Sequence, residues 1–246
     1  MDSPLPSLNT LSPHGGVLTV HLLGLVKWEA TLGLQEQLIY DLSGRDDLNG
    51  VLFLCEHPVQ ITMGREASRR QLLLDDEELR IRELPVRWVS RGGGAICHAP
   101  GQLAIYLQVP LKRLGIGLTE YRARLETAAV TACQELKIPA KRQSHEPGIW
   151  TRGGQLGYFG AGIRSWISCH GLFLNVTVDP RLLEITDSGG TRATSMQSLR
   201  LDPVRMPQVR EALIRSISNQ FGYAQTDLAT GHPLLRRTTQ RVSIHA

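Results

Sequence analysis

Arg91-Gly-Gly-Gly-Ala-Ile-Cys-His98-Ala-Pro-Gly-Gln102 is the segment of this sequence that says most about its fold. Three consecutive glycines after a predicted strand allow positive φ angles and let the backbone approach a ligand closely. Arg91 can bind an anion, and His98 is a candidate acid, base or hydrogen-bond donor. Taken alone, the segment is about equally compatible with a tight turn that carries incidental polar residues.

Predicted strands and helices lie on both sides of this segment. Short apolar or alternating runs predict strands at residues 16–26, 50–55, 86–90, 103–109, 149–151, 156–167 and 172–178. Apolar residues at helical spacing predict helices at 28–43, 119–137 and 207–222, and residues 66–83 form a charged surface segment. Clustered strands with a few long helices predict an α+β fold with mixed or mostly antiparallel sheets.

The composition is that of a globular protein with one large domain or two small ones. Its 246 residues are 41% hydrophobic and 20% charged, and this length can bury a sizeable core. The net charge of +4 is too mild to indicate a nucleic-acid binder, which needs basic residues clustered on one face. The four cysteines contain no C-x-x-C pair, which argues against disulfides and metal knuckles and favours a reducing compartment.

The ends of the chain carry weaker signals. Residues 1–15 have no basic n-region and no apolar h-region, so we expect a flexible lead-in rather than a signal peptide. No apolar stretch reaches the roughly 20 residues that a membrane span needs, which predicts a soluble, cytoplasmic protein. The domain is expected over residues 16–222, followed by a basic, solvated and partly disordered tail at 223–246.

Several standard catalytic motifs are absent from the sequence. It has no G-x-x-x-x-G-K-[ST], H-E-x-x-H or G-x-S-x-G, which removes the main support for nucleotide-triphosphate, zinc-protease and α/β-hydrolase functions. His98 and His170 have no Cys, Asp or Glu at ligand spacing, apart from the adjacent Cys97 and Cys169. We therefore expect neither a metal nor a cofactor.

Two further polar clusters follow the glycine run. The first contains Cys169, His170 and Asn175, of which the last two can orient a carbonyl group. Because neighbours on a strand point to opposite faces, a catalytic pair of Cys169 and His170 is not expected. The second cluster is Ile185-Thr-Asp-Ser-Gly-Gly190, a polar turn that could expose Ser188 near a site.

In this order, the segments resemble the octanoyltransferase family of lipoate biosynthesis, within the lipoate/biotin protein ligase-like superfamily. The family pattern R-G-G-x-x-T-[YFW]-H-G-P-G-Q is similar to residues 91–102, with Ile96, Cys97 and Ala99 as departures. E-H-P-P-V-Y-T-x-G-R is similar to residues 56–65, G-V-W-V to 148–150, and W-x-T-x-H-G-x-A-L-N to 166–175. The similarity extends from about residue 17 to residue 199.

The resemblance implies a lipoate/biotin protein ligase-like α+β domain, with a large mixed β-sheet flanked by helices and a tunnel for an eight-carbon acyl chain. It implies transfer of that chain from octanoyl-acyl carrier protein to a lysine of lipoyl domains, in 2-oxoacid dehydrogenase complexes or the glycine cleavage protein. Nucleic acid, membrane and cofactor are not expected, and the protein is expected to be a monomer. The residues assigned to substrate binding are Arg91, Gly92, Gly93, Gly94, Ala95, Ile96, Cys97, His98, Tyr158, Phe159, Gly160, His170, Gly171, Leu172, Phe173 and Asn175.

Both catalytic residues of the family are replaced. The family uses a Cys nucleophile in a P-C-G loop and a Lys in a K-I-x-x-x-G strand. A thiolate opens the thioester, and a nearby ammonium lowers the pKa of the thiol. Counting from Trp150 and from His170 puts Gln155 at the lysine position, and Ser188 aligns with the cysteine. A serine needs an adjacent general base, which Gln155 cannot provide.

Three mechanisms remain open at this point. In the first, His98 or His170 activates Ser188 and an acyl-ester forms. In the second, the target lysine attacks the bound thioester directly. In the third, the protein is a catalytically silent homologue that binds an acyl group or a lipoyl domain. An ATP-dependent ligase is disfavoured because the strand around Gln155 has no adenylate-binding lysine, and a pure scaffold would have bulky residues beside residues 92–94.

Overall fold

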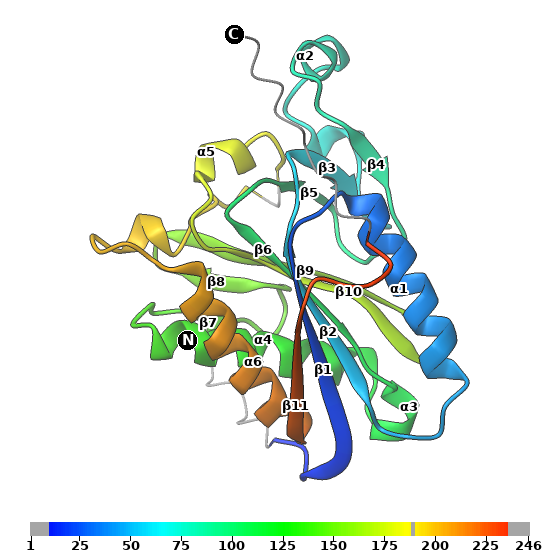
Figure 1. Cartoon of the computed structure of the whole chain (residues 1–246). Coiled ribbons are helices and arrows are strands. Elements are labelled where there is room, and N and C mark those ends of the chain that lie inside the picture. The colour runs from blue at the N-terminus through cyan, green and yellow to red at the C-terminus, as the bar shows by residue number, and fades with distance from the viewer. Residues whose placement is uncertain (1–9, 188–189, 236–246) are drawn as a thin grey trace, which may run out of the picture.

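The computed structural model of the chain describes residues 10–187 and 190–235. They form an eight-stranded sheet and a three-stranded sheet, with helices on both faces of the larger one (Figure 1). The predicted α+β fold with a large mixed sheet flanked by helices is therefore confirmed.

The large sheet is parallel at one side and antiparallel across the rest. β1 pairs in parallel with both β11 and β2, and every later pair from β2 to β7 is antiparallel. In spatial order its strands are β11 (Tyr223–Thr230), β1 (His14–Leu25), β2 (Gly50–Glu56), β6 (Gln102–Gln108), β10 (Ile167–Asn175), β9 (Gly154–Arg164), β8 (Ile149–Thr151) and β7 (Lys141–Arg142).

The small sheet contains the strands on either side of the glycine run, residues 92–94. It consists of β4 (Val86–Trp88), β3 (Gln60–Met63) and β5 (Ala95–His98), with β3 in the centre. The helices are α1 (Trp28–Ser43), α2 (Asp76–Ile81), α3 (Leu111–Leu114), α4 (Leu118–Glu135), α5 (Pro180–Leu183) and α6 (Met206–Phe221), with 3₁₀ turns at Arg69–Gln71 and Gln197–Leu199. In Figure 1 the small sheet and α2 lie together at the top of the molecule.

Two hydrophobic cores lie on opposite faces of the large sheet. Side chains along a strand alternate between faces, so Leu52 and Leu54 of β2 pack with α4 and α6. Phe53 and Cys55 of the same strand pack with α1 and the small sheet. The second core contains the glycine run's neighbours, and it therefore positions the candidate site.

The predicted strand over residues 156–167 is two strands in the structure. β9 ends at Arg164 and β10 begins at Ile167, and both residues of the connecting turn have positive φ, 51° at Ser165 and 61° at Trp166. A two-residue hairpin turn with this twist usually contains Asn or Gly. Because neither residue is present here, the sequence gives no turn signal at this place.

The expected tail at 223–246 is wrong for its first part. Residues 223–230 form β11, which pairs in parallel with β1, and α6 ends before it at Gly222 with a left-handed φ of 74°. Apart from Tyr223, most of β11 is exposed and polar, so backbone pairing forms this strand without an apolar pattern. The part of the tail from residue 236 lies outside the described residues.

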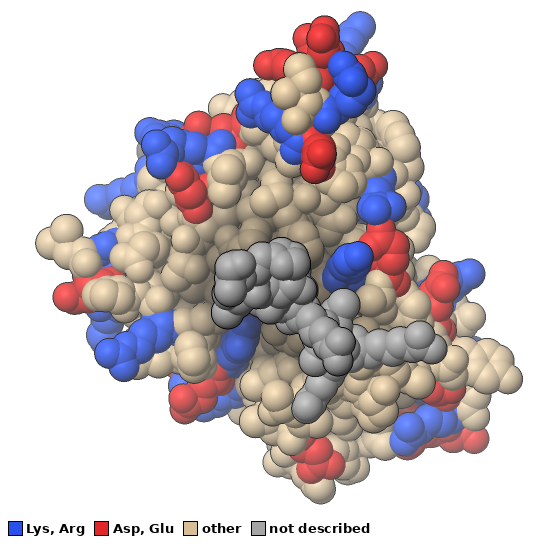
Figure 2. Space-filling view, turned by 45° about the horizontal axis from the view of Figure 1, so that its top comes forward, with Lys and Arg blue, Asp and Glu red and all other residues tan. Residues whose placement is uncertain are grey.

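The surface carries charges of both signs. On the face drawn in Figure 2, basic and acidic side chains are interspersed around the rim. Among the described residues, no helix is both long and apolar enough to cross a membrane.

Candidate functional site

The glycine run connects β4 to β5 and packs directly against β9. Gly92 N–H donates to the Ala161 carbonyl at 2.9 Å, and a Cβ on Gly160 would lie 2.9 Å from the Gly92 carbonyl oxygen. A Cβ on Gly94 would meet the Gln71 amide at 2.5 Å. The glycines thus permit close approach of the backbone to β9 and to Gln71. The nearest atoms to these glycines belong to the main chain and to the polar side chains of Gln71, Glu66 and Arg91, not to bulky apolar side chains.

Arg91 is fully buried and points into the protein. Its Nε and Nη2 donate to the Thr62 hydroxyl at 3.2 and 2.8 Å, and Nη1 donates to the Gly92 carbonyl at 2.8 Å. Burial lowers the pKa of the guanidinium to about 9. Arg91 therefore ties the glycine run to β3, and its guanidinium is engaged inside the protein.

A chain of buried side chains crosses from the small sheet to the large one. The Thr62 hydroxyl donates to His98 Nε2 at 2.9 Å, and His98 Nδ1 donates to Gln102 Oε1 at 2.8 Å. Gln102 Nε2 then donates to Asn175 Oδ1 at 3.0 Å, and Asn175 Nδ2 donates to the Thr194 carbonyl at 2.9 Å. Each group donates in the same direction. This polar chain therefore fixes one orientation for every amide and for the imidazole.

His98 lies in the middle of this polar chain and not at a surface. Both ring nitrogens are used, and burial, followed by the charges of His57 and Arg91, holds the pKa of His98 well below its usual range. The imidazole is therefore neutral at pH 7 and has no free nitrogen with which to activate Ser188.

His170 has an unusual backbone conformation for a strand residue. Its φ is 57°, its N–H donates to Gln35 Oε1 at 2.6 Å, and its ring stacks on Trp28 with centroids 6.2 Å apart. Cys169 packs with Ile39 and Leu42 of the same helix, α1. The expectation that Cys169 and His170 point to opposite faces is wrong, because the positive φ breaks the alternation of the strand.

The predicted acyl-binding residues of β9 and β10 divide between the two cores. Phe159 pairs with Leu172, and both pack on the α4 side of the sheet. Tyr158 pairs with Phe173, and both pack on the α1 side, where His98 lies. Strand alternation therefore brings only Tyr158 and Phe173 of these four to the glycine run's side.

Gly171, Ala95, Ile96 and Cys97 are buried. Gly171 packs against the β6 backbone, where a Cβ would lie 2.1 Å from the Ile105 carbonyl oxygen. Cys97 Sγ lies 3.2 Å from the Leu182 carbonyl. Burial raises the pKa of Cys97 and of Cys133 to about 12, and it also raises the pKa of Cys55 and Cys169. None of these thiols is a ready nucleophile near neutral pH, because the thiolate is the reactive form.

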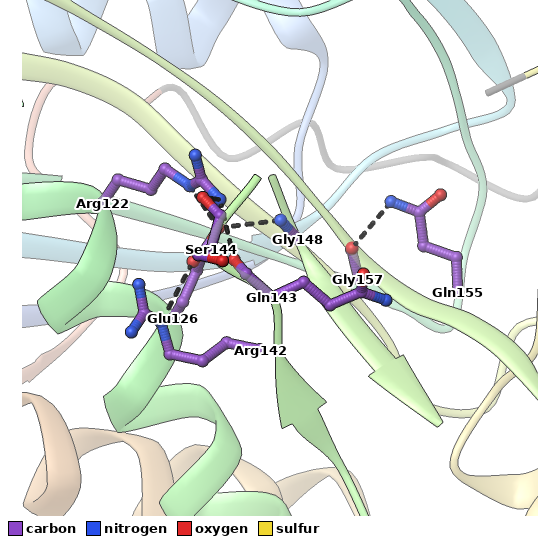
Figure 3. A network of polar contacts seen from close by, with 8 residues as sticks. All are labelled: Arg122, Glu126, Arg142, Gln143, Ser144, Gly148, Gln155 and Gly157. Atoms are coloured by element: carbon purple, nitrogen blue, oxygen red, sulfur yellow. Dashed lines mark hydrogen bonds and ion pairs between the residues drawn. The ribbon is translucent and has the colours of Figure 1, made fainter. Parts of the chain in front are cut away.

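Gln155, which the sequence analysis predicts at the family lysine position, is buried at the start of β9. Its Nε2 donates to the Gly157 carbonyl at 3.3 Å, and its Oε1 has no hydrogen-bond partner (Figure 3). Gly148 lies close to this amide. A Cβ at position 148 would be only 2.9 Å from Gln155 Nε2, so a larger residue would not fit there. The free atom of Gln155 is therefore an acceptor.

A buried carboxylate fixes the backbone that Gln155 packs against. Glu126 Oε1 accepts from Gly148 N–H at 2.7 Å and from Arg122 Nε at 2.9 Å, and Oε2 lies 3.4 Å from Arg142 Nε (Figure 3). Arg122 also donates to the Gln143 carbonyl at 3.1 Å. Burial raises the pKa of Glu126 although these hydrogen bonds lower it.

Ser188 and Gly189 lie outside the described residues, but the ends of their loop are placed. On one side, Asp187 N–H donates to the Gln71 carbonyl at 2.8 Å, next to the glycine run. On the other side, Gln155 N–H donates to the Arg192 carbonyl at 2.9 Å, and Thr194 N–H donates to the Gln155 carbonyl at 3.0 Å. The loop therefore spans from the neighbourhood of Gly94 to Gln155.

Other features of the described residues lie apart from this arrangement. A groove of about 640 Å³ between α6 and β11 is lined by Leu22, Ile214 and Leu228, among others, and by none of the predicted site residues. No three His, Cys, Asp or Glu side chains among residues 10–187 and 190–235 are grouped to hold a metal ion.

Sequence reasoning missed several residues that build the site. Thr62 and Gln102 stand inside the quoted motifs, where their polar character among apolar neighbours was an available signal. Trp28 and Gln35 contact His170 from α1, and Glu126 supports Gln155 from α4. No local pattern marks these three, because their partners are more than 20 residues away in the chain.

Comparison with known proteins identifies the family. The model of the lipoyl protein ligase A/B catalytic domain matches residues 28–218. An octanoyltransferase of Geobacter metallireducens is 34% identical, with 82% of this chain and 90% of that protein covered. An octanoyltransferase of Acidobacterium capsulatum is 32% identical, with 84% and 89% covered.

Solved structures agree in fold. A lipoate-protein ligase A, solved with bound ATP, has a TM-score of 0.70 at 17% identity, with 89% of this chain and 90% of that chain covered. A lipoate protein ligase from Thermoplasma acidophilum has a TM-score of 0.69 at 15% identity, with 90% and 89% covered. At such identities the likeness concerns the fold alone. Together with the sequence matches, it means that this chain belongs to the lipoyl protein ligase A/B catalytic domain family, among the relatives of its octanoyltransferases.

Proposed function

We propose that this protein transfers an octanoyl group from acyl carrier protein to a lysine side chain of a lipoyl domain. In this reaction the amide C–N bond forms, the thioester C–S bond breaks, and a proton of the amine goes to the leaving thiolate. The proposal is supported by the similarity to octanoyltransferases over more than four fifths of the chain. The acceptors that we propose are the lipoyl domains of 2-oxoacid dehydrogenase complexes or the glycine cleavage protein, and we propose that the enzyme acts as a cytoplasmic monomer.

The observation that carries this proposal is that three segments meet along β9, the strand that contains Gln155. The glycine run lies against β9. The loop end at Asp187 lies near the run, and the loop end at Arg192 is bonded to Gln155. Beside them, Asn175 donates to the Thr194 carbonyl. A thioester carbonyl between the run and Gln155 would lie close to the family's reaction position.

We favour direct attack by the target lysine. As the amine attacks the thioester, positive charge develops on its nitrogen, and a hydrogen-bond acceptor stabilises that charge where a second ammonium would repel it. Gln155 Oε1 is such an acceptor and has no partner of its own. A serine route needs a base beside Ser188, and His98 is unsuited because both of its ring nitrogens are engaged.

The test is a mass-spectrometric transfer assay with octanoyl-acyl carrier protein and an apo lipoyl domain. We expect octanoylation of the domain without ATP, and we expect Ser188→Ala to retain it. Loss of transfer in Ser188→Ala would establish the serine route instead. Measurable thioester binding without any transfer would mean a catalytically silent homologue, and modification only with ATP and a free acid would mean a ligase.

A further inference from the structure

Tyr158 lies on β9 between Gln155 and the part of the strand that contacts the glycine run. That contact is made at Gly160, where a Cβ would lie 2.9 Å from the Gly92 carbonyl oxygen. Most residues of the stretch 156–162 have no side chain on this side of the sheet. Three of them pack in the core on the α4 side and three are glycines: Leu156, Phe159, Ala161, Gly157, Gly160 and Gly162. Tyr158 is therefore the only side chain of this stretch that packs on the α1 side, where the glycine run lies.

The phenol ring of Tyr158 reaches from β9 toward β5 and the end of α5. Burial raises the pKa of its hydroxyl, a hydrogen bond with Asn175 opposes this shift, and Cys97 and Glu184 are close enough to act on the same pKa. Cys97 belongs to β5, which follows the glycine run, and Glu184 follows α5 and leads to Asp187. The ring thus stands between two of the segments that meet along β9, and it is 7% exposed.

An acyl chain bound at the proposed transfer position has to pass this ring. The thioester carbonyl is proposed to lie between the glycine run and Gln155, and the apolar chain behind it is stabilised by removal from water. On the α1 side of β9, Tyr158 is the side chain that the acyl chain meets. Phe173 pairs with it on β10, is fully buried, and has its ring centroid 4.6 Å from that of His98. Aromatic rings therefore close the space beside and behind Tyr158.

We propose that Tyr158 determines which acyl chain this protein transfers: its ring ends the space for the chain, so that an octanoyl group fits and longer chains do not. The inference rests on the proposed transfer of an octanoyl group. Protein interiors are densely packed, and forcing extra methylenes into them displaces side chains at a cost in free energy. Because the ring is packed on several sides, a longer chain has to displace it or leave its last carbons in water.

The experiment compares octanoyl- and decanoyl-acyl carrier protein as donors for the full chain and its variants. In Tyr158→Ala, we expect the ratio of kcat/KM for decanoyl over octanoyl transfer to rise about 100-fold, because each extra methylene at a closed apolar wall changes the rate about tenfold or more. Tyr158→Phe keeps the ring and should keep the ratio of the wild type. Tyr121→Ala, which removes a buried tyrosine ring from the core on the α4 side, should also keep it.

A milder variant accompanies Tyr158→Ala, because the loss of a buried ring destabilises a fold. Tyr158→Leu keeps an apolar side chain and frees less space, so we expect the same ratio to rise about tenfold. Thermal unfolding of each variant shows which of them are folded at the temperature of the assay. An unchanged ratio in folded Tyr158→Leu, or an equal rise in Tyr121→Ala, would overturn the proposal.

A binding measurement separates this inference from the proposed function. Isothermal titration calorimetry with octanoyl- and decanoyl-pantetheine requires no turnover, and the wild type should bind the octanoyl compound at least tenfold more tightly. Tyr158→Leu should reduce that difference. Selective binding without transfer would support the role of Tyr158 and contradict the transfer reaction. Transfer of octanoyl and decanoyl groups at equal rates by the wild type would support the reaction and contradict the role of Tyr158, and binding of neither compound would contradict both.

Discussion

Gln155 donates its side-chain N–H to the carbonyl oxygen of Gly157, two residues along the same strand, and this contact leaves the Gln155 amide oxygen buried without a partner. An unpaired buried acceptor costs about 1–3 kcal/mol in folding free energy. A group kept at such a cost in a site is a candidate for function. In the direct-attack mechanism that we propose, this oxygen would bind the attacking amine.

Gln155→Met separates this role from a structural one. The substitution removes the unpaired acceptor at similar volume, so we expect unfolding stability to be unchanged or higher. We expect kcat for octanoyl transfer to fall about tenfold, because the developing charge on the amine loses about 1.4 kcal/mol of stabilisation. Transfer kinetics and thermal unfolding measure the two effects, and Gln37→Met, on the exposed side of α1, is the control. Unchanged kcat would contradict the role of Gln155.

Glu126→Gln should destabilise the fold strongly. The change keeps the shape of the side chain but leaves Arg122 and Arg142 without their buried counter-charge, and breaking such a group costs about 3 kcal/mol. Urea unfolding measures the loss. Glu211→Gln, which breaks an exposed pair with Arg215, should cost under about 1 kcal/mol. Equal effects of both substitutions would mean that the Glu126 cluster does not hold the loop before β8.

Thr62→Val should break the polar chain at its first member. Valine has the same shape, but Arg91 then loses its hydroxyl acceptor and His98 loses its donor, both inside the protein. We expect a loss of about 3 kcal/mol in unfolding free energy. Thr119→Val, at an exposed position of α4, should change stability by less than about 0.5 kcal/mol. Denaturant titrations of both variants provide the comparison.

Acidification should destabilise the protein before most carboxylates titrate. Burial lowers the pKa of His57 and of His170 to about 4, while both titrate near 6.5 when the chain is unfolded. Between these two pKa values the unfolded state binds more protons than the folded state. The free energy of unfolding is therefore unaffected by these histidines above pH 6.5 and falls as the pH drops toward 4. Once the pH is below both pKa values, each of these histidines has lowered the free energy of unfolding by roughly 3 kcal/mol.

Urea unfolding from pH 7.5 to 4.5 tests this pH dependence. His57→Gln should flatten the curve, since the titrating group is removed. His145→Gln, at an exposed position, should leave the curve as it is. A stability that does not change over this range would mean that these buried imidazoles are accessible to protons in the folded protein.

Much of the fold could be read from local patterns. The helix at 28–43 has the predicted bounds, and the strands of the central sheet fall within a few residues of the predicted ones. Strand β11 and the turn at Ser165 and Trp166 could not be predicted, because backbone pairing forms the first and two strained φ angles form the second. Neither has a marker in residue type.

The sequence by itself determined the family and the α+β class, because these depend on residue identities and spacing along the chain. Only the tertiary structure decided how the side chains are used. It engages both nitrogens of His98 in a buried polar chain, turns Cys169 and His170 to the same helix, and brings Ser90 to an imidazole 80 positions away. Such contacts join segments that are distant in the chain, and one positive φ can reverse the direction of a side chain, so no local pattern encodes them.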